Sequence, residues 1–249
     1  MASVLGTDRA GVYARDRGLS TAEAKRFGRA LCQRCVGVPL QHLTGDQPFR
    51  RLNLIVRPGV FIPRPETEIV VECALAALTG VPVPVVVDVG TGTGAIALTI
   101  KDERPDARVL AIDLSPEAVE LARENATRSS LDVEIVQGDL LEPVPVVLRG
   151  SVDLVVSNPP YVEPHELPAL PREVLADPLL ALAGGIEVYE RLFTQAAEAL
   201  RPGGAVVVEI GESQGSRVRA AAVAAGFVSV EVEPDLDGRD RIVTGRTPE

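Results

Sequence analysis

The sequence predicts an α/β fold: a mostly parallel, doubly wound sheet of seven strands, preceded by a short N-terminal helical appendage and a β-hairpin linker. Three observations lead to this prediction. From Pro84 onwards, short valine-rich runs alternate with segments of helical periodicity, which is typical of a parallel sheet. A glycine-rich stretch follows the first of these runs. The tetrapeptide Asn158-Pro159-Pro160-Tyr161 ends the fourth run, because proline cannot extend a buried strand.

The length and composition limit the class of protein. A chain of 249 residues can form one large α/β domain and a small additional element. No apolar run approaches the roughly 18 residues that a membrane span needs, and the first residues lack the apolar core of a secretory signal. We therefore expect a cytoplasmic protein without membrane contact. The net charge of −10 argues against nucleic acid as the main partner, although arginines between Arg9 and Arg34 could form a local basic patch.

The N-terminal region, residues 1–38, is expected to be helical. Thr21 to Val36 has helical periodicity and Ser20 suits its N-cap, while Gly11 to Arg17 predicts a shorter helix. So few residues cannot form an independent core, so they should be an appendage. Cys32 and Cys35 have C-x-x-C spacing, but no second Cys or His pair lies near them, so we predict reduced thiols and no metal site.

Residues 39–80 are expected to be a linker with a hairpin and a helix. The apolar runs 52–56 and 60–62 predict two strands, with Pro58-Gly59 as the turn, and Glu66 begins a helix to about Leu78. Residues 81–249 then form the main domain. Its expected strands are 85–89, 108–112, 133–136, 152–156 and 205–210, closed by an antiparallel pair at 228–232 and 241–244, and its helices are 95–102, 116–128, 187–200 and 215–225.

The glycine-rich loop from Asp88 to Gly94 lies where an α/β sheet binds nucleotides. Such a loop alone could bind NAD, FAD, a phosphate or S-adenosylmethionine. Asp113 ends the second strand, where a carboxylate can hold ribose hydroxyls, and Asp139 with Leu140 could frame an adenine. Asp88, at the mouth of the loop, suits the ammonium group of a methionine moiety better than a pyrophosphate.

The tetrapeptide 158–161 places an amide, backbone carbonyls and an aromatic ring at the carboxyl end of a strand, where open α/β sheets bind ligands. This set can hold a planar NH2 group while its nitrogen attacks an electrophile. The alternative is a proline-rich turn that only caps the strand.

These features together resemble the Rossmann-like class I S-adenosylmethionine-dependent methyltransferases, in which N-P-P-Y is typical of enzymes that methylate planar NH2 groups. The block from Gly59 to Glu68 is similar to the hallmark segment of the HemK/PrmC-type glutamine N5-methyltransferases, which modify the GGQ motif of peptide chain release factors. Residues 37–45, Asp177-Pro178 and 181–185 resemble flanking segments of that family, so the resemblance covers roughly residues 10 to 246.

The resemblance implies S-adenosyl-L-methionine as cofactor, release factors as substrates and no stable nucleic-acid binding. The implied cofactor-binding residues are Asp88, Gly90, Thr91, Gly92, Thr93, Gly94, Asp113, Leu114, Asp139, Leu140 and Asn158. The implied catalytic residues are Asn158, Pro159, Pro160 and Tyr161, and Phe61, Pro65 and Thr67 join Asn158, Pro159 and Tyr161 on the substrate side. Asn158 would accept a hydrogen bond from the substrate amide through its side-chain oxygen, and the Pro159 carbonyl would accept a second. Arg64 is expected to pin the linker to the main domain.

The sequence departs from this family in two places and leaves alternatives open. Leu140 stands where the family often has an aromatic residue, and the N-terminal helical bundle is reduced to one or two helices. The substrate could instead be a nucleobase (adenine N6 type) or a small-molecule amide or amine. A non-catalytic partner-binding protein of the same fold is a further alternative.

Overall fold

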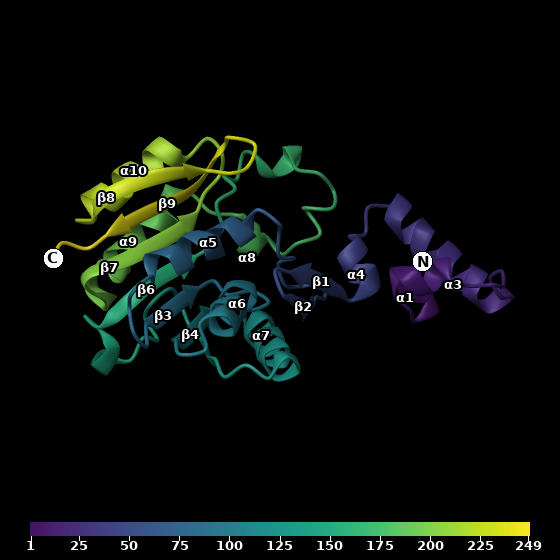
Figure 1. The fold of residues 1–249 in the computed structure, drawn as a ribbon. Coiled ribbons are helices and arrows are strands. Elements are labelled where there is room, and N and C mark those ends of the chain that lie inside the picture. The colour runs from purple at the N-terminus through teal and green to yellow at the C-terminus, as the bar shows by residue number, and fades with distance from the viewer.

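The computed structural model describes residues 1–249 and contains one large sheet with helices on both faces (Figure 1). The seven strands run in the order β5-β4-β3-β6-β7-β9-β8. The first five are parallel, and β9 is antiparallel to both β7 and β8. The predicted doubly wound sheet with its antiparallel edge is thereby confirmed.

The boundaries of the predicted sheet strands and helices agree with the structure to within two residues or so, except that β7 begins at Leu200 and not at residue 205, and α8 was not predicted. The strands are β3 Val85–Val89, β4 Arg108–Asp113, β5 Glu134–Gln137, β6 Val152–Ser157, β7 Leu200–Glu209, β8 Val228–Pro234 and β9 Asp240–Arg246. The helices are α5 Thr67–Ala77, α6 Ala95–Glu103, α7 Pro116–Ser129, α8 Leu179–Leu182, α9 Ile186–Ala199 and α10 Gly215–Ala224, with short 3-10 turns at η1 Val146–Leu148 and η2 Leu167–Ala169.

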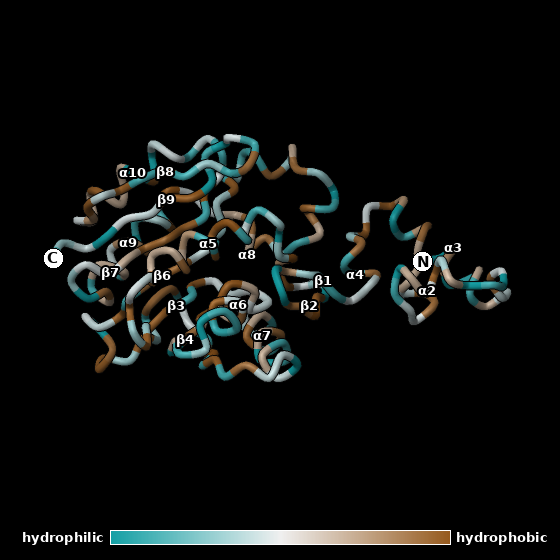
Figure 2. Tube along the Cα trace, viewed as in Figure 1, coloured by the Kyte–Doolittle hydropathy of each residue, from teal (hydrophilic) through white to brown (hydrophobic).

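Two hydrophobic cores lie on opposite faces of the sheet. Val86 of β3 packs into the core beneath α5, α6 and α7, whereas its neighbour Val87 packs into the core beneath α9 and α10. Because both faces are covered, each central strand is a continuous apolar run and not an alternating one. Figure 2 shows these hydrophobic stretches through the middle of the sheet. The cores hold the strands rigidly and leave their carboxyl ends to form a site.

The predicted hairpin is wrong in its strands. The structure pairs β1 Asp46–Phe49 with β2 Leu52–Ile55, and Val60–Ile62 forms no strand. The reversal occurs at Arg50, which adopts a φ of 47° and whose backbone N–H donates to the Glu68 carboxylate (3.0 Å). Pro48 lies inside β1, and proline in a short run argues against a strand when only the sequence is considered.

The N-terminal region (residues 1–45) consists of four short helices that extend away from the sheet (Figure 1). They are α1 Ala2–Leu5, α2 Arg9–Tyr13, α3 Thr21–Cys35 and α4 Leu40–Thr44. The predicted α3 is confirmed, with Ser20 in a capping box. The shorter helix predicted at 11–17 lies instead at Arg9–Tyr13, and α1 and α4 were not predicted. None of the four helices contains a buried residue. No helix in the structure has both the length and the apolar character required to cross a bilayer.

Candidate functional site

A cavity of about 860 Å³ lies at the carboxyl ends of the parallel strands. Strands β3 and β6 are direct neighbours, so the glycine loop (residues 90–94) and the Asn158 turn (residues 158–161) meet at one edge of the sheet. A Cβ atom on Gly90 would lie 3.8 Å from the Asn158 carbonyl oxygen. The linker segment (residues 59–67) forms the opposite wall. Three segments far apart in sequence therefore surround one space.

The glycine loop presents its backbone to this cavity. Gly90, Thr91, Gly92 and Thr93 line it, and Gly90 and Gly92 have φ angles of 72° and 56° that favour glycine. Gly94 does not line the cavity. Its φ is 86°, and an added Cβ would lie 3.0 Å from Leu98, so this glycine is required for helix packing.

Asp88 lies beneath the loop and not at its mouth, which differs from the expected position. The side chain is fully buried, and Oδ2 accepts hydrogen bonds from Thr91 Oγ1 (2.6 Å) and the Ala97 N–H (3.1 Å). Oδ1 has no partner. Burial raises the pKa of Asp88 to about 7, against the two hydrogen bonds, which lower it. This carboxyl group holds the loop against α6.

Asp113 lies at the end of β4 and lines the cavity. Its Oδ2 accepts from the Gly92 N–H (2.8 Å) and its Oδ1 from the Ser115 N–H (2.9 Å), so both oxygens are fixed and each keeps a free lone pair. Burial raises the pKa of Asp113 despite these bonds. Leu114, Asp139 and Leu140 also line the cavity, and Arg191 holds Asp139 at 2.5 Å.

All four residues of the Asn158 turn line the cavity. Asn158 Nδ2 donates to Thr67 Oγ1 (3.2 Å), and the Tyr161 hydroxyl lies 3.4 Å from Glu209 Oε1. Burial raises the pKa of Tyr161, so this phenol stays protonated at neutral pH. Gly184 packs so closely that an added Cβ would lie 2.0 Å from the Pro160 carbonyl oxygen.

The linker segment contributes Phe61 and Thr67 to the wall, whereas Pro65 is exposed and lies outside the lining. Arg64 pairs with Asp177, whose Oδ1 also accepts from the Ile62 N–H (3.2 Å). Burial raises the pKa of Asp177 to about 6, although Arg64 lowers it. Arg64 thus pins the linker to the loop after β6, as predicted.

The charged residues of the cavity that were not predicted include Glu209 at the end of β7 and Arg241 on β9. Glu209 is 1% exposed and accepts a hydrogen bond from Thr67 Oγ1 (2.7 Å). Burial raises the pKa of Glu209 to about 7, while Thr67 and Arg241 lower it. An acid within an otherwise apolar run, at 205–210, was the available signal in the sequence.

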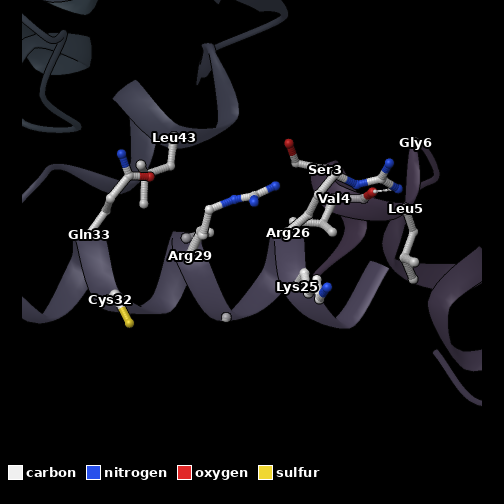
Figure 3. Close-up of a pocket in the computed structure, with 12 residues that line it drawn as sticks. Ser3, Val4, Leu5, Gly6, Lys25, Arg26, Arg29, Cys32, Gln33 and Leu43 are labelled. Atoms are coloured by element: carbon white, nitrogen blue, oxygen red, sulfur yellow. Dashed lines mark hydrogen bonds between the residues drawn. The ribbon is translucent and has the colours of Figure 1, made fainter. Parts of the chain in front are cut away.

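A second cleft, of about 1100 Å³, lies in the N-terminal region (Figure 3). Lys25, Arg26 and Arg29 of α3 line it, and Arg26 donates to the Val4 carbonyl (3.1 Å). Residues 1–45 contain seven Lys and Arg and three Asp and Glu, so their formal charge is +4. Because the whole chain carries −10, residues 46–249 carry −14. The N-terminal cleft therefore lies in a region of net positive charge, and the cavity at the sheet lies in a region of net negative charge.

Comparisons with known proteins give consistent matches. Residues 52–185 match the methyltransferase small domain, and residues 1–45 match the PrmC N-terminal domain. A release factor glutamine methyltransferase of Moorella thermoacetica is 45% identical over 230 residues, which cover 90% of this chain and 80% of the relative. One from Deinococcus radiodurans is 45% identical over 228 residues, with the same coverage. The crystal structure of a methyltransferase from Pyrococcus furiosus aligns with a TM-score of 0.56 at 18% identity, covering 91% of this chain and all of that one.

Proposed function

Since the chain belongs to the release factor glutamine methyltransferase family, we propose that it transfers a methyl group from S-adenosylmethionine to the glutamine amide of the GGQ motif of peptide chain release factors. The single observation that supports this best is the cavity in which the glycine loop, the Asn158 turn and the linker segment meet. It brings a cofactor cradle and a holder for a planar NH2 group within one space.

The cavity suits S-adenosylmethionine. The backbone of Gly90 and Gly92 is open to a ligand because no side chain covers it. The free lone pairs of Asp113 can accept the two hydroxyls of a ribose, and Leu140 can contact the adenine. When bound, the cofactor supplies an electrophilic methyl group on a positively charged sulfur. Asp88 acts indirectly, by holding the loop through Thr91 and Ala97.

The Asn158 turn holds the substrate amide. A carboxamide nitrogen is a poor nucleophile because its lone pair is delocalised into the carbonyl group. Asn158 Oδ1 and the Pro159 carbonyl accept hydrogen bonds from the two N–H groups of the substrate amide, which fixes the orientation of the nitrogen. Tyr161 packs on the amide plane. Orientation of this kind accounts for a large part of enzymatic rate enhancement. Phe61 and Thr67 complete the wall on the substrate side.

The N-terminal region contacts the protein substrate, mainly through residues 1–38. Its match to the PrmC N-terminal domain supports this role, and so does the basic cleft of α3 (Figure 3). Lys25 and Arg29 are exposed and have no ion-pair partner, so they are available to an acidic surface of a release factor. Arg34 links α3 to the loop after β6 through Glu173 (2.7 Å).

Methylation of a purified release factor with labelled S-adenosylmethionine tests the proposal. We expect label on the glutamine of the GGQ motif and none on a release factor in which that glutamine is alanine. Equal labelling of both release factors would contradict the proposed function, and mass spectrometry of the peptide would locate the methyl group.

A further inference from the structure

Three residues from three different elements form one hydrogen-bond chain at the wall of the cavity. Glu209 Oε2, at the end of β7, accepts from Thr67 Oγ1 at the start of α5 (2.7 Å). Thr67 Oγ1 in turn accepts from Asn158 Nδ2 after β6 (3.2 Å). Glu209 and Thr67 are 1% and 4% exposed, so water does not compete for these bonds. The chain ends on the side chain that we propose holds the substrate.

The chemistry of the three groups fixes the direction of these bonds. A carboxylate only accepts hydrogen bonds, and a threonine hydroxyl has a single proton to donate. While Glu209 is ionised, Thr67 donates that proton to it, and the Thr67 oxygen is left as an acceptor. Asn158 must then donate to Thr67 through its Nδ2, so its Oδ1 is the atom that remains available to a ligand in the cavity.

The burial of Glu209 is unfavourable for folding, because a buried charge without a direct ion pair is costly. The groups that face it are Thr67 and Glu66 at the start of α5, Tyr161 after β6, Tyr189 of α9 and Arg241 of β9. Arg241 is the only cation among them, and its ion-pair partner is Asp235 and not Glu209. Retaining an acid here is consistent with a role in the site and not in stability.

We propose that Glu209 is a positioning residue: acting through Thr67, its carboxylate sets which end of the Asn158 amide faces the substrate. This inference rests on the proposed function, since it explains why Asn158 presents an acceptor to the substrate NH2 group. A neutral residue at 209 removes the constraint. Its N–H or O–H can donate to Thr67, whose proton is then free to turn towards Asn158 and reverse that amide.

The variant Glu209→Gln tests this with almost no change in shape. We expect kcat for release factor methylation to fall roughly tenfold or more, while the dissociation constant for S-adenosylmethionine stays unchanged. Thr67→Val breaks the same chain, so the double variant Glu209→Gln/Thr67→Val should be no slower than Thr67→Val alone. Unchanged kcat in Glu209→Gln, or additive losses in the double variant, would overturn the proposal.

The pH dependence gives a second readout. The pKa of Glu209 is raised by burial to about 7, so the carboxyl group gains a proton as the pH falls through that value. We expect kcat of the unsubstituted protein to fall below about pH 7, and this fall to be smaller in Glu209→Gln, in which Asp88 still titrates. A purely structural role for Glu209 would not shift the pH profile in this way.

The spectroscopic form of this test needs no substrate and so separates the inference from the proposed function. In protein with isotope-labelled asparagine, the side-chain amide signals of Asn158, assigned by their absence in Asn158→Ala, should move with a midpoint near pH 7. They should not move in Glu209→Gln. Asn158 chemical shifts that do not change with pH in the unsubstituted protein would contradict the inference, even if methylation of the release factor is observed. Absence of methylation with the expected titration would contradict only the proposed function.

Discussion

The sheet region (residues 46–249) and the N-terminal region (residues 1–45) differ in both burial and charge. The sheet region has two buried cores and a formal charge of −14, whereas the four N-terminal helices bury no residue and the region carries +4. The sheet region can therefore hold reacting groups in fixed positions by itself. The N-terminal region is tied to the sheet region by surface contacts such as the Arg34–Glu173 ion pair and not by a buried core, so its exposed cationic face is suited to binding and not to chemistry.

Loss of the Asn158 side chain should have the largest effect and locate the chemistry in the sheet region. In Asn158→Ala, we expect methyl transfer to fall by roughly 10²-fold or more, about 3 kcal/mol of transition-state stabilisation, because the substrate amide loses an oriented acceptor. Calorimetry should show that S-adenosylmethionine still binds. Asn53→Ala, at an exposed asparagine of β2, is the control and should keep full activity. Unchanged turnover in Asn158→Ala would remove this residue from the mechanism.

Asp88→Asn should change how the free energy of unfolding depends on pH. This effect is specific to the sheet region, because only that region contains fully buried acids. The folded-state pKa of Asp88 is about 7, against an ordinary value of 3.8, so between these values the folded protein holds a proton that the unfolded chain has lost. The free energy of unfolding must therefore decrease as the pH rises through this window. The contribution of Asp88 is about 2 kcal/mol between pH 5 and pH 7.

Asparagine at this position can keep the acceptor oxygen that Thr91 and Ala97 use, but it cannot titrate. Denaturant unfolding at pH 5, 6 and 7 should give a flatter profile for Asp88→Asn than for the unsubstituted protein. Glu209 shifts stability in the same direction and is present in both proteins, so the difference between them isolates Asp88. Identical slopes would show that Asp88 is not the titrating group.

The two regions also differ in how far their structures follow from the sequence. The strands of the sheet are predictable because both faces are buried, which gives uninterrupted runs such as 85–89 and 152–156. The predicted position of the hairpin was wrong for two reasons: Pro48 argues against a strand at β1, and the turn contains Arg50 at a positive φ and not a glycine. Helices α1 and α4 have four and five residues, too short for a periodic signal.

The candidate site shows the same division. Motif positions such as Asn158 and Asp113 could be predicted because Asp113 is the last residue of its strand and Asn158 directly follows its own, and these strands end at one edge of the sheet. The inward position of Asp88 and the exposure of Pro65 could not, since they depend on how α6 and the linker pack. Glu209 was missed because its partner Thr67 lies 142 residues away, and only the fold brings the two together.

Reversing charges in the N-terminal cleft should have a moderate effect that appears only with a protein substrate. In Lys25→Glu/Arg29→Glu, we expect the KM for a release factor to rise on the order of tenfold, about 1.4 kcal/mol, with kcat unchanged. Arg26 is left in place because it donates to the Val4 carbonyl. Arg128→Glu/Arg149→Glu makes the same change in net charge at exposed positions of the sheet region and serves as the control.

Steady-state kinetics with a whole release factor and with a short GGQ peptide would separate docking from chemistry. The peptide should be methylated equally by both double variants and by the unsubstituted protein. An equal rise in the KM for the release factor in both variants would mean that overall charge, and not the α3 cleft, governs binding.

The smallest effect should come from Cys32 and Cys35, although their C-x-x-C spacing is the most conspicuous pattern in the N-terminal region. Both thiols are free and exposed on α3. Replacing either thiol with a hydroxyl group therefore leaves no cavity. We expect Cys32→Ser/Cys35→Ser to change the free energy of unfolding by less than about 0.5 kcal/mol and to leave release factor KM and kcat unchanged, with or without a reductant. Activity that depends on reductant in the unsubstituted protein but not in the double variant would contradict this. It would also assign chemistry to the region that, by its burial and charge, should only bind.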